Sequence, residues 1–189
     1  MNHRYLQKFQ IKDVVFLAIM SAVALATCAV MPLVISLQPL IFGISQLVTA
    51  LQIGVFFAIG LYKVRKPGSL LIMVLMMGLI QLMMSPPMFL SSVLNGILIE
   101  LIVLLLFRGY EKDGAVFVAA MLHTPLSLPF NYLYNRLIKG ADSPLAAVAD
   151  RAPLAAVGMT LSVVAVSALG ALIGIKIARE LKKSGVLKK

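Results

Sequence analysis

The sequence of 189 residues contains little charge, one cysteine and no tryptophan. Charged residues make up 13% of the chain and hydrophobic residues 61%, whereas soluble domains contain about 25% charged and about 50% apolar residues. This composition excludes a soluble domain, and it excludes a disordered or nucleic-acid-binding explanation of the net charge of +10. The single cysteine, Cys28, excludes an intramolecular disulfide.

Sequence motifs of catalysis and of energy coupling are absent as well. The chain contains no GxxxxGK[ST] motif for a P-loop ATPase and no HExxH motif for a zinc protease. The segment Gly43-Ile44-Ser45-Gln46 departs from the GxSG pattern of a serine intramembrane protease. Only one carboxylate, Glu100, is expected within the membrane, so an acidic catalytic pair is excluded. We therefore expect a protein that is not an enzyme and that carries no metal or cofactor.

Long apolar runs separated by polar or proline-containing breaks predict an all-α membrane protein with a single domain, residues 1–189. A membrane-spanning helix takes about 20 residues. The first run is long for the core of a signal peptide, although charge alone does not exclude cleavage. The runs predict six transmembrane helices at about 14–36, 40–62, 69–84, 88–107, 114–138 and 154–177, followed by a basic cytoplasmic tail, 178–189.

The basic residues predict how these helices are oriented. Short cytoplasmic loops of membrane proteins collect Lys and Arg. Fourteen of the 17 basic residues fall in the N-terminal arm, the second and fourth loops and the tail, and three, Arg136, Lys139 and Arg151, fall around the fifth loop. We expect both termini to be cytoplasmic, in a multi-pass protein of the cell membrane.

Glu100 is the one acidic residue in the middle of a predicted span. An acidic side chain at the centre of a bilayer costs about 3 kcal/mol, so it usually faces a cavity or a partner and is a candidate functional group. Ser92 and Gly96 share its helix face, whereas Asn95 points away from that face. These small neighbours fit a ligand pocket and a close helix crossing equally well, and Glu100 could instead fix helix packing.

Span five carries the longest polar stripe, formed by His123, Ser127, Asn131 and Tyr134. On an ideal helix these four side chains fall within about 80° of one another. Pro125 and Pro129 lie in the same span, where they remove backbone donors and are expected to bend or break the helix. The stripe therefore predicts either a polar pocket or a set of groups that satisfy the broken backbone.

Other spans carry patterns that predict helix packing. Span two places Ser45, Thr49 and Gln52 on one face, and span three contains Gln81; we expect these groups to join helices. Gly170 and Gly174 form a weak GxxxG pattern in span six.

Span one differs from the others because it carries a stripe of small residues. Ala18, Ala22 and Ala26 recur at every fourth position. Such spacing lets another helix approach closely. The partner helix could belong to this chain or to another one.

Three segments of the chain resemble those of a known family of membrane proteins. They are Arg65-Lys66-Pro67-Gly68-Ser69-Leu70, Asn95-Gly96-Ile97-Leu98-Ile99-Glu100-Leu101 and Arg108-Gly109-Tyr110. Together with six spans and an alanine-striped first helix, they resemble the S component of an energy-coupling-factor (ECF) transporter, most closely the thiamine or hydroxymethylpyrimidine type. The resemblance implies a substrate-capture subunit that takes a small vitamin-like ligand. It also implies two kinds of partner, a transmembrane coupling subunit and two cytoplasmic ATPases.

On this interpretation the alanine stripe of span one docks on the coupling subunit, and the pocket opens outward among spans four to six and the first loop. We expect Glu100 to accept a hydrogen bond from, or to balance the charge of, a nitrogenous ligand. His123, Asn131, Tyr134 and Ser127 are the other expected ligand contacts. Two alternatives remain: an autonomous secondary transporter or small channel, proton-coupled through Glu100 and His123, and an assembly protein whose polar groups only pack helices.

Overall fold

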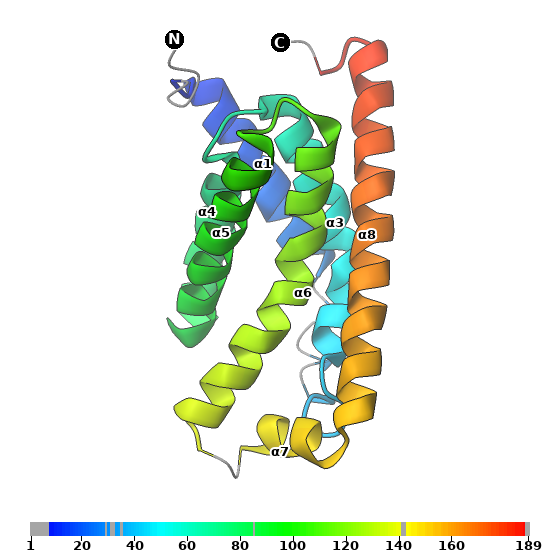
Figure 1. Ribbon diagram of the computed structural model, residues 1–189. Helices are drawn as coiled ribbons and strands as arrows, with labels where there is room; N and C mark the ends of the chain where they lie inside the picture. The colour runs from blue at the N-terminus through cyan, green and yellow to red at the C-terminus, as the bar shows by residue number, and fades with distance from the viewer. Residues whose placement is uncertain are drawn as a thin grey trace.

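The computed structural model describes residues 8–28, 30, 33–34, 36–84, 86–140 and 143–187. These residues form helices and no β-strand, which confirms the expected all-α architecture (Figure 1). The helices are α1 (Ile11–Thr27), α3 (Ile44–Val64), α4 (Ser69–Met84), α5 (Pro86–Phe107), α6 (Asp113–Leu137), α7 (Pro144–Arg151) and α8 (Pro153–Lys183).

Four of these helices are long and apolar enough to cross a membrane: α3, α5 from Met88, α6 and α8. α1 and α4 are shorter, with 17 and 16 residues, and they occupy the positions predicted for spans one and three. Residues 29, 31, 32 and 35 of predicted span one, and residues 1–7 and 188–189 at the termini, lie outside the described part of the chain. The number of six spans and the side on which the termini lie therefore stay predictions.

Helices are found in two segments that lie outside the predicted spans, a connection and the tail. The polar connection of residues 139–153 contains the eight-residue helix α7, which begins with Pro144, a residue suited to the first turn of a helix. α8 continues to Lys183, so the first part of the predicted basic tail is helical. Ala, Arg, Glu, Leu and Lys fill this part of α8, and all five have high helix propensity.

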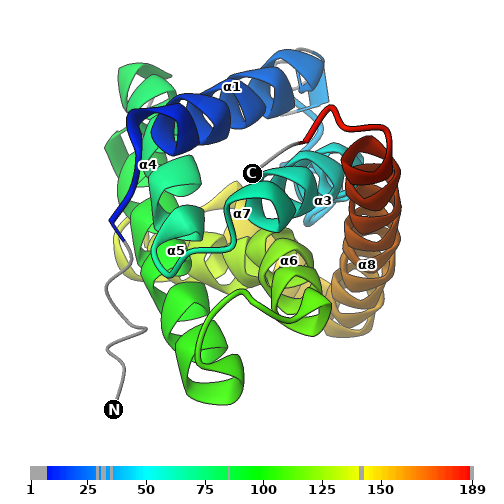
Figure 2. The same cartoon turned by 90° about the horizontal axis from the view of Figure 1, so that it is seen from above.

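The helix α3 lies at the centre of the bundle and packs against α1, α4, α6 and α8 (Figure 2). Its side chain Phe57 is fully buried. α4 and α5 form an antiparallel hairpin, and α5 also packs against α6. The main core joins five helices, α1, α3, α4, α5 and α6, through the buried side chains Leu17, Phe57, Leu61, Met73, Val103 and Val116, and it extends to α8 through Ala171 and Ile175.

The weak GxxxG pattern of α8 lies where this helix crosses α3. A Cβ atom built on Gly170 would lie 2.5 Å from the carbonyl oxygen of Leu51, and one on Gly174 would collide with the carbonyl oxygen of Val55. Glycine is therefore required at both positions because the backbones approach so closely. The pattern marks a helix contact within the chain.

The two ends of the bundle differ in charge. The last turns of α3 and α8 and the first turns of α1, α4 and α6 lie at one end, which we call the basic end (Figure 1). The other end holds α7 and the segment before α3, and we call it the α7 end. The described basic residues at the basic end are Lys8, Lys12, Lys63, Arg65, Lys66, Arg108, Lys112, Lys176, Arg179, Lys182 and Lys183.

Candidate functional site

Glu100 lies below the loops of the basic end, and both of its carboxylate oxygens have partners within the chain. Oε1 accepts a hydrogen bond from the backbone N–H of Gly68 at 2.6 Å, and Oε2 accepts one from the Tyr110 hydroxyl at 2.9 Å. Tyr110 is fully buried. Burial, together with the neighbouring Glu100 carboxylate, raises the pKa of this phenol well above its usual range, so Tyr110 remains a donor.

The helix face that Glu100 shares with Ser92 and Gly96 packs against α4. Ser92 donates a 2.5 Å hydrogen bond to Oε1 of Gln81, and a Cβ on Gly96 would lie 3.0 Å from the side chain of Val74. The sequence left two arrangements open for this face, a ligand pocket and a close helix crossing, and the structure has the close helix crossing. Gln81 joins two helices, as its position predicted. A ligand-binding role of Glu100 stays a prediction, since the carboxylate makes the bonds of the packing alternative.

The buried polar groups that meet in the middle of the bundle are Asn95 on α5 and His123 and Thr124 on α6. The Asn95 amide donates a 2.6 Å hydrogen bond to the carbonyl oxygen of His123. The His123 ring packs against Phe57 of α3, with ring centroids 4.7 Å apart. All three polar side chains are at most 5% exposed. We call Asn95, His123 and Thr124 the inner polar cluster.

Each residue of the inner polar cluster has a buried polar atom without a hydrogen-bond partner among the described residues. These atoms are Oδ1 of Asn95, Nδ1 of His123 and Oγ1 of Thr124. An unpaired buried polar atom costs about 1–3 kcal/mol, so such atoms are expected where a ligand or an ordered water completes the bonding. The unpaired atoms of the cluster are an amide oxygen, a ring nitrogen and a hydroxyl oxygen.

The prolines of α6 do not break the helix, which is continuous from Asp113 to Leu137. Pro125 lacks the N–H that would bond to the carbonyl oxygen of Met121 four residues earlier. Ser167 of α8 supplies the missing donor, because its hydroxyl donates a 2.7 Å hydrogen bond to that oxygen. A break is therefore not observed, a kink at these prolines stays a prediction, and a neighbouring helix satisfies the freed carbonyl.

The rest of the predicted polar stripe follows α6 toward the α7 end. Ser127, Asn131 and Tyr134 are half-buried, in contrast to the buried His123. The Ser127 hydroxyl donates to the carbonyl oxygen of Thr124 at 2.7 Å, within its own helix. The stripe therefore has one residue in the inner polar cluster and three on the stretch of α6 that leads out of it.

Sequence reasoning missed three residues of this region. Asn95 and Thr124 belong to the inner polar cluster, and Asn135 joins α6 to the start of α7. Its side-chain oxygen accepts a 2.9 Å hydrogen bond from Ser143, and its amide donates to the carbonyl oxygen of Asn131 at 2.8 Å. A signal was available for Asn95, since it is a lone amide in an apolar span, where polar groups seek partners.

The first loop folds over the start of α3 at the α7 end. The Gln38 amide donates to the Ser45 hydroxyl, which donates to Oε1 of Gln46 at 2.8 Å. A Cβ atom on Gly43 would lie 3.0 Å from the side chains of Leu128 on α6 and Met159 on α8. The first loop, α6 and α8 thus meet at the end of the bundle toward which the polar stripe runs.

Residues 11–183 match a protein family described as "Hypothetical bacterial integral membrane protein (Trep_Strep)". The chain belongs to this family. A solved structure described as "Crystal structure of an S-component of ECF transporter" is similar with a TM-score of 0.66 and 20% sequence identity, over 95% of this chain and 89% of that chain. No curated protein matches the sequence. The expected multi-pass membrane protein is confirmed, and its fold is that of an ECF S component.

In this Trep_Strep protein the alanine stripe of α1 points away from the chain's own helices. Ala22 and Ala26 are exposed and Ala18 is half-buried. The opposite face carries the buried Leu17 and Ser21, and the Ser21 hydroxyl donates a 3.1 Å hydrogen bond to the carbonyl oxygen of Met73 on α4. Within the described part of the chain nothing covers Ala22 or Ala26, so these positions can contact lipid or another chain.

Ion pairs join the helices of the Trep_Strep protein at the basic end. Asp113, at the start of α6, pairs with Arg65 after α3 and with Arg179 of α8, the latter at 2.6 Å. Asp13 of α1 pairs with Lys66 at 2.6 Å. The second loop and the basic tail, which the distribution of charge assigns to the same side of the membrane, thus meet through the shared Asp113. Among the described residues, no three His, Cys, Asp or Glu side chains gather where they could hold a metal ion.

Proposed function

We propose that this protein is the substrate-capture subunit of an ECF-type importer. The observation that carries the proposal is the S-component fold, which extends over 95% of the chain. The chain lacks a P-loop motif, which fits a subunit whose nucleotide sites lie on partner ATPases. Its role on this proposal is to bind a small molecule and to present it to a transmembrane coupling subunit.

The proposed ligand site lies along the polar stripe of α6, next to α5 and α3, and we propose that it opens at the α7 end. Its inner end is the inner polar cluster, whose unpaired atoms favour a ligand that both donates and accepts hydrogen bonds. Ser127, Asn131 and Tyr134 are the proposed contacts nearer the opening.

A nitrogen heterocycle such as thiamine or its hydroxymethylpyrimidine portion fits these groups, since amino groups donate and ring nitrogens accept. The ligand type rests on the resemblance in sequence. Two of the residues that carry this resemblance, Gly68 and Glu100, bond to each other at the basic end. They consequently support the class of subunit more than the identity of the ligand.

Calorimetric titration of the detergent-purified protein with thiamine, hydroxymethylpyrimidine and other B vitamins tests the ligand site. His123→Phe and Asn95→Leu are expected to lower the affinity for the ligand that binds about tenfold or more, because each removes a buried hydrogen-bonding group. Tyr132→Phe is the matched control: Tyr132 also lies on α6, and its hydroxyl donates to Asp150 at the α7 end. Unchanged affinity in both cluster variants would overturn the proposed site.

Reconstitution into liposomes separates this proposal from the secondary-transporter alternative. A capture subunit is expected to bind its ligand without sustained uptake until the coupling subunit and the ATPases are present. A proton-coupled transporter is expected to accumulate ligand when the purified chain alone experiences a proton gradient. Uptake by the single chain, abolished by Glu100→Gln, would overturn the importer-subunit proposal and support the alternative. Absence of any saturable ligand across the vitamin set would instead favour an assembly protein.

A further inference from the structure

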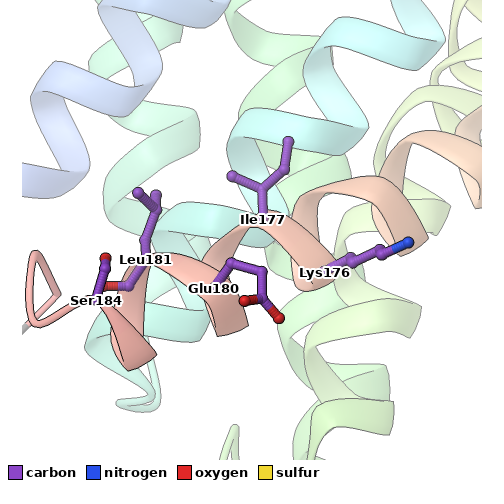
Figure 3. A pocket seen from close by; sticks show the side chains of 5 residues that line it. All are labelled: Lys176, Ile177, Glu180, Leu181 and Ser184. Atoms are coloured by element: carbon purple, nitrogen blue, oxygen red, sulfur yellow. The ribbon is translucent and has the colours of Figure 1, made fainter.

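A groove of about 640 Å³ runs along the outside of the basic end, between the first turns of α6 and the last turns of α8. Its lining residues are Asp113, Gly114 and Phe117 of α6 and Leu172, Ile175, Lys176, Arg179, Glu180 and Lys183 of α8. A second depression follows the same turns of α8, and Figure 3 shows Lys176 and Glu180 on its wall. α8 extends past the start of α6 at this end of the bundle (Figure 1).

The lining of the groove changes from apolar to basic along the direction of the helices. Phe117 and Leu172 lie on the turns farther from the basic end, and Ile175 lies one turn closer to it. Arg179 and Lys183 follow on the next two turns of α8. The groove therefore has an apolar wall on the side of the helix centres and cationic groups toward the basic end.

The acids of the groove are paired with bases, which leaves the groove with excess positive charge. Asp113 is shared between Arg65 and Arg179, and Glu180 accepts a 2.7 Å bond from Lys183. Lys176 is exposed and makes no hydrogen bond or ion pair with any described residue. An anionic group at this level would meet Lys176, whose charge also acts on Glu180, and would compete with Glu180 for Lys183.

We propose that this groove binds one anionic phospholipid, with an acyl chain along Phe117, Leu172 and Ile175 and the phosphate beside Lys176 and Lys183. Charge complementarity selects an anionic over a zwitterionic headgroup. The apolar wall selects a lipid over a free phosphate, since only a lipid covers both parts of the groove. The lipid site is independent of the proposed ligand site, whose proposed opening is at the other end of the bundle.

Native mass spectrometry of the full chain in detergent, titrated separately with phosphatidylglycerol and phosphatidylcholine, tests the proposal. Phosphatidylglycerol is expected to remain bound at about one molecule per chain, at least about fivefold more than phosphatidylcholine. Because each lysine near a headgroup contributes substantially to anionic-lipid binding, the double variant Lys176→Gln/Lys183→Gln is expected to lower retention about tenfold. The double variant Lys12→Gln/Lys63→Gln removes the same charge at the same end but outside the groove, and it is expected to retain the lipid.

A second variant tests the shape of the groove without changing its charge. Gly114 is exposed and helical, and a Cβ there meets only the Phe107 ring, at 3.4 Å, so Gly114→Leu is expected to fold. Because Gly114 lines the groove, the larger side chain is expected to narrow it and to lower phosphatidylglycerol retention at least about fivefold. The proposal is overturned by equal retention of the two lipids, by an equal loss in the Lys12/Lys63 control, or by inorganic phosphate displacing the lipid at equal concentration.

Discussion

The backbone N–H of Gly68 donates a 2.6 Å hydrogen bond to the Glu100 carboxylate, so a buried acid on α5 fixes the turn that precedes α4. Gly68 has a positive φ of 88°, a conformation that glycine adopts without strain. The second carboxylate oxygen holds Tyr110 in the loop that leads to α6. One side chain thus connects two loops of the basic end, and these two hydrogen bonds offset part of the cost of burying an acid in an apolar helix.

Glu100→Ala is expected to lower the free energy of unfolding by about 2–4 kcal/mol, because the Gly68 N–H and the Tyr110 hydroxyl both lose their acceptor. Glu100→Gln is expected to cost about 1 kcal/mol or less, since an amide keeps one acceptor and the phenol can turn to accept from its NH₂ group. Thermal unfolding in detergent measures both effects. Tyr110→Phe, which removes a single donor, is expected to fall between them. A tenfold loss of ligand affinity in folded Glu100→Gln, with Tyr110→Phe unaffected, would instead identify Glu100 as a ligand contact.

Gly170→Ala is expected to lower the free energy of unfolding by about 1–3 kcal/mol, because the added methyl group overpacks the crossing of α3 and α8. Gly158→Ala is the matched control on the same helix, since a Cβ there would meet nothing within 4 Å. The control is expected to be neutral or slightly stabilising, as alanine favours the helix. Equal effects of the two substitutions would mean that helix propensity, and not the crossing, determines the result.

Ser167→Ala is expected to lower the free energy of unfolding by about 1 kcal/mol, since the Met121 carbonyl freed by Pro125 loses its donor. In a Pro125→Ala background the helix supplies its own N–H to that carbonyl, and Ser167→Ala is expected to cost much less. The double-mutant cycle therefore has a coupling energy of about 0.5–1 kcal/mol. Additive effects would show that the two residues do not share the carbonyl.

Ala22→Trp and Ala26→Trp are expected to leave thermal stability and ligand affinity unchanged, because both side chains are exposed. They are expected to reduce co-purification with a coupling subunit several-fold, since a bulky group blocks close helix approach. Ala165→Trp, at an exposed alanine of α8, is the control for added bulk. Normal assembly of both α1 variants would exclude this stripe as the docking surface.

Several features of the site were open to prediction because they follow from local chemistry. His123 is a polar residue in an apolar span, and the structure buries it as the cost of exposing such a group to lipid requires. Asn95 was placed off the Glu100 face by helical geometry, and it does lie on another side of α5, toward α6. What it contacts there depends on where α6 crosses α5, which helical periodicity does not specify.

For Glu100, too, the sequence predicted the burial of the side chain but not its partners. Its sequence position predicted an expensive buried charge, and the carboxylate is buried at 7% exposure. Its partners lie 32 and 10 residues away along the chain. The loops that carry them fold back over α5, and that depends on how the helices of the bundle pack.

By itself the sequence determined that the chain lies in a membrane, that it is helical, where the long apolar helices lie and that basic residues collect at one end. These features follow from composition, hydropathy and charge, which act locally along the chain. Only the tertiary structure decided that Glu100 holds Gly68, that Ser167 satisfies the Met121 carbonyl and that Gly170 marks the crossing of α3 and α8. Each of these contacts joins residues distant in sequence, and hydrogen bonds and close packing are short-ranged. Their partners are therefore fixed by the three-dimensional arrangement of the helices.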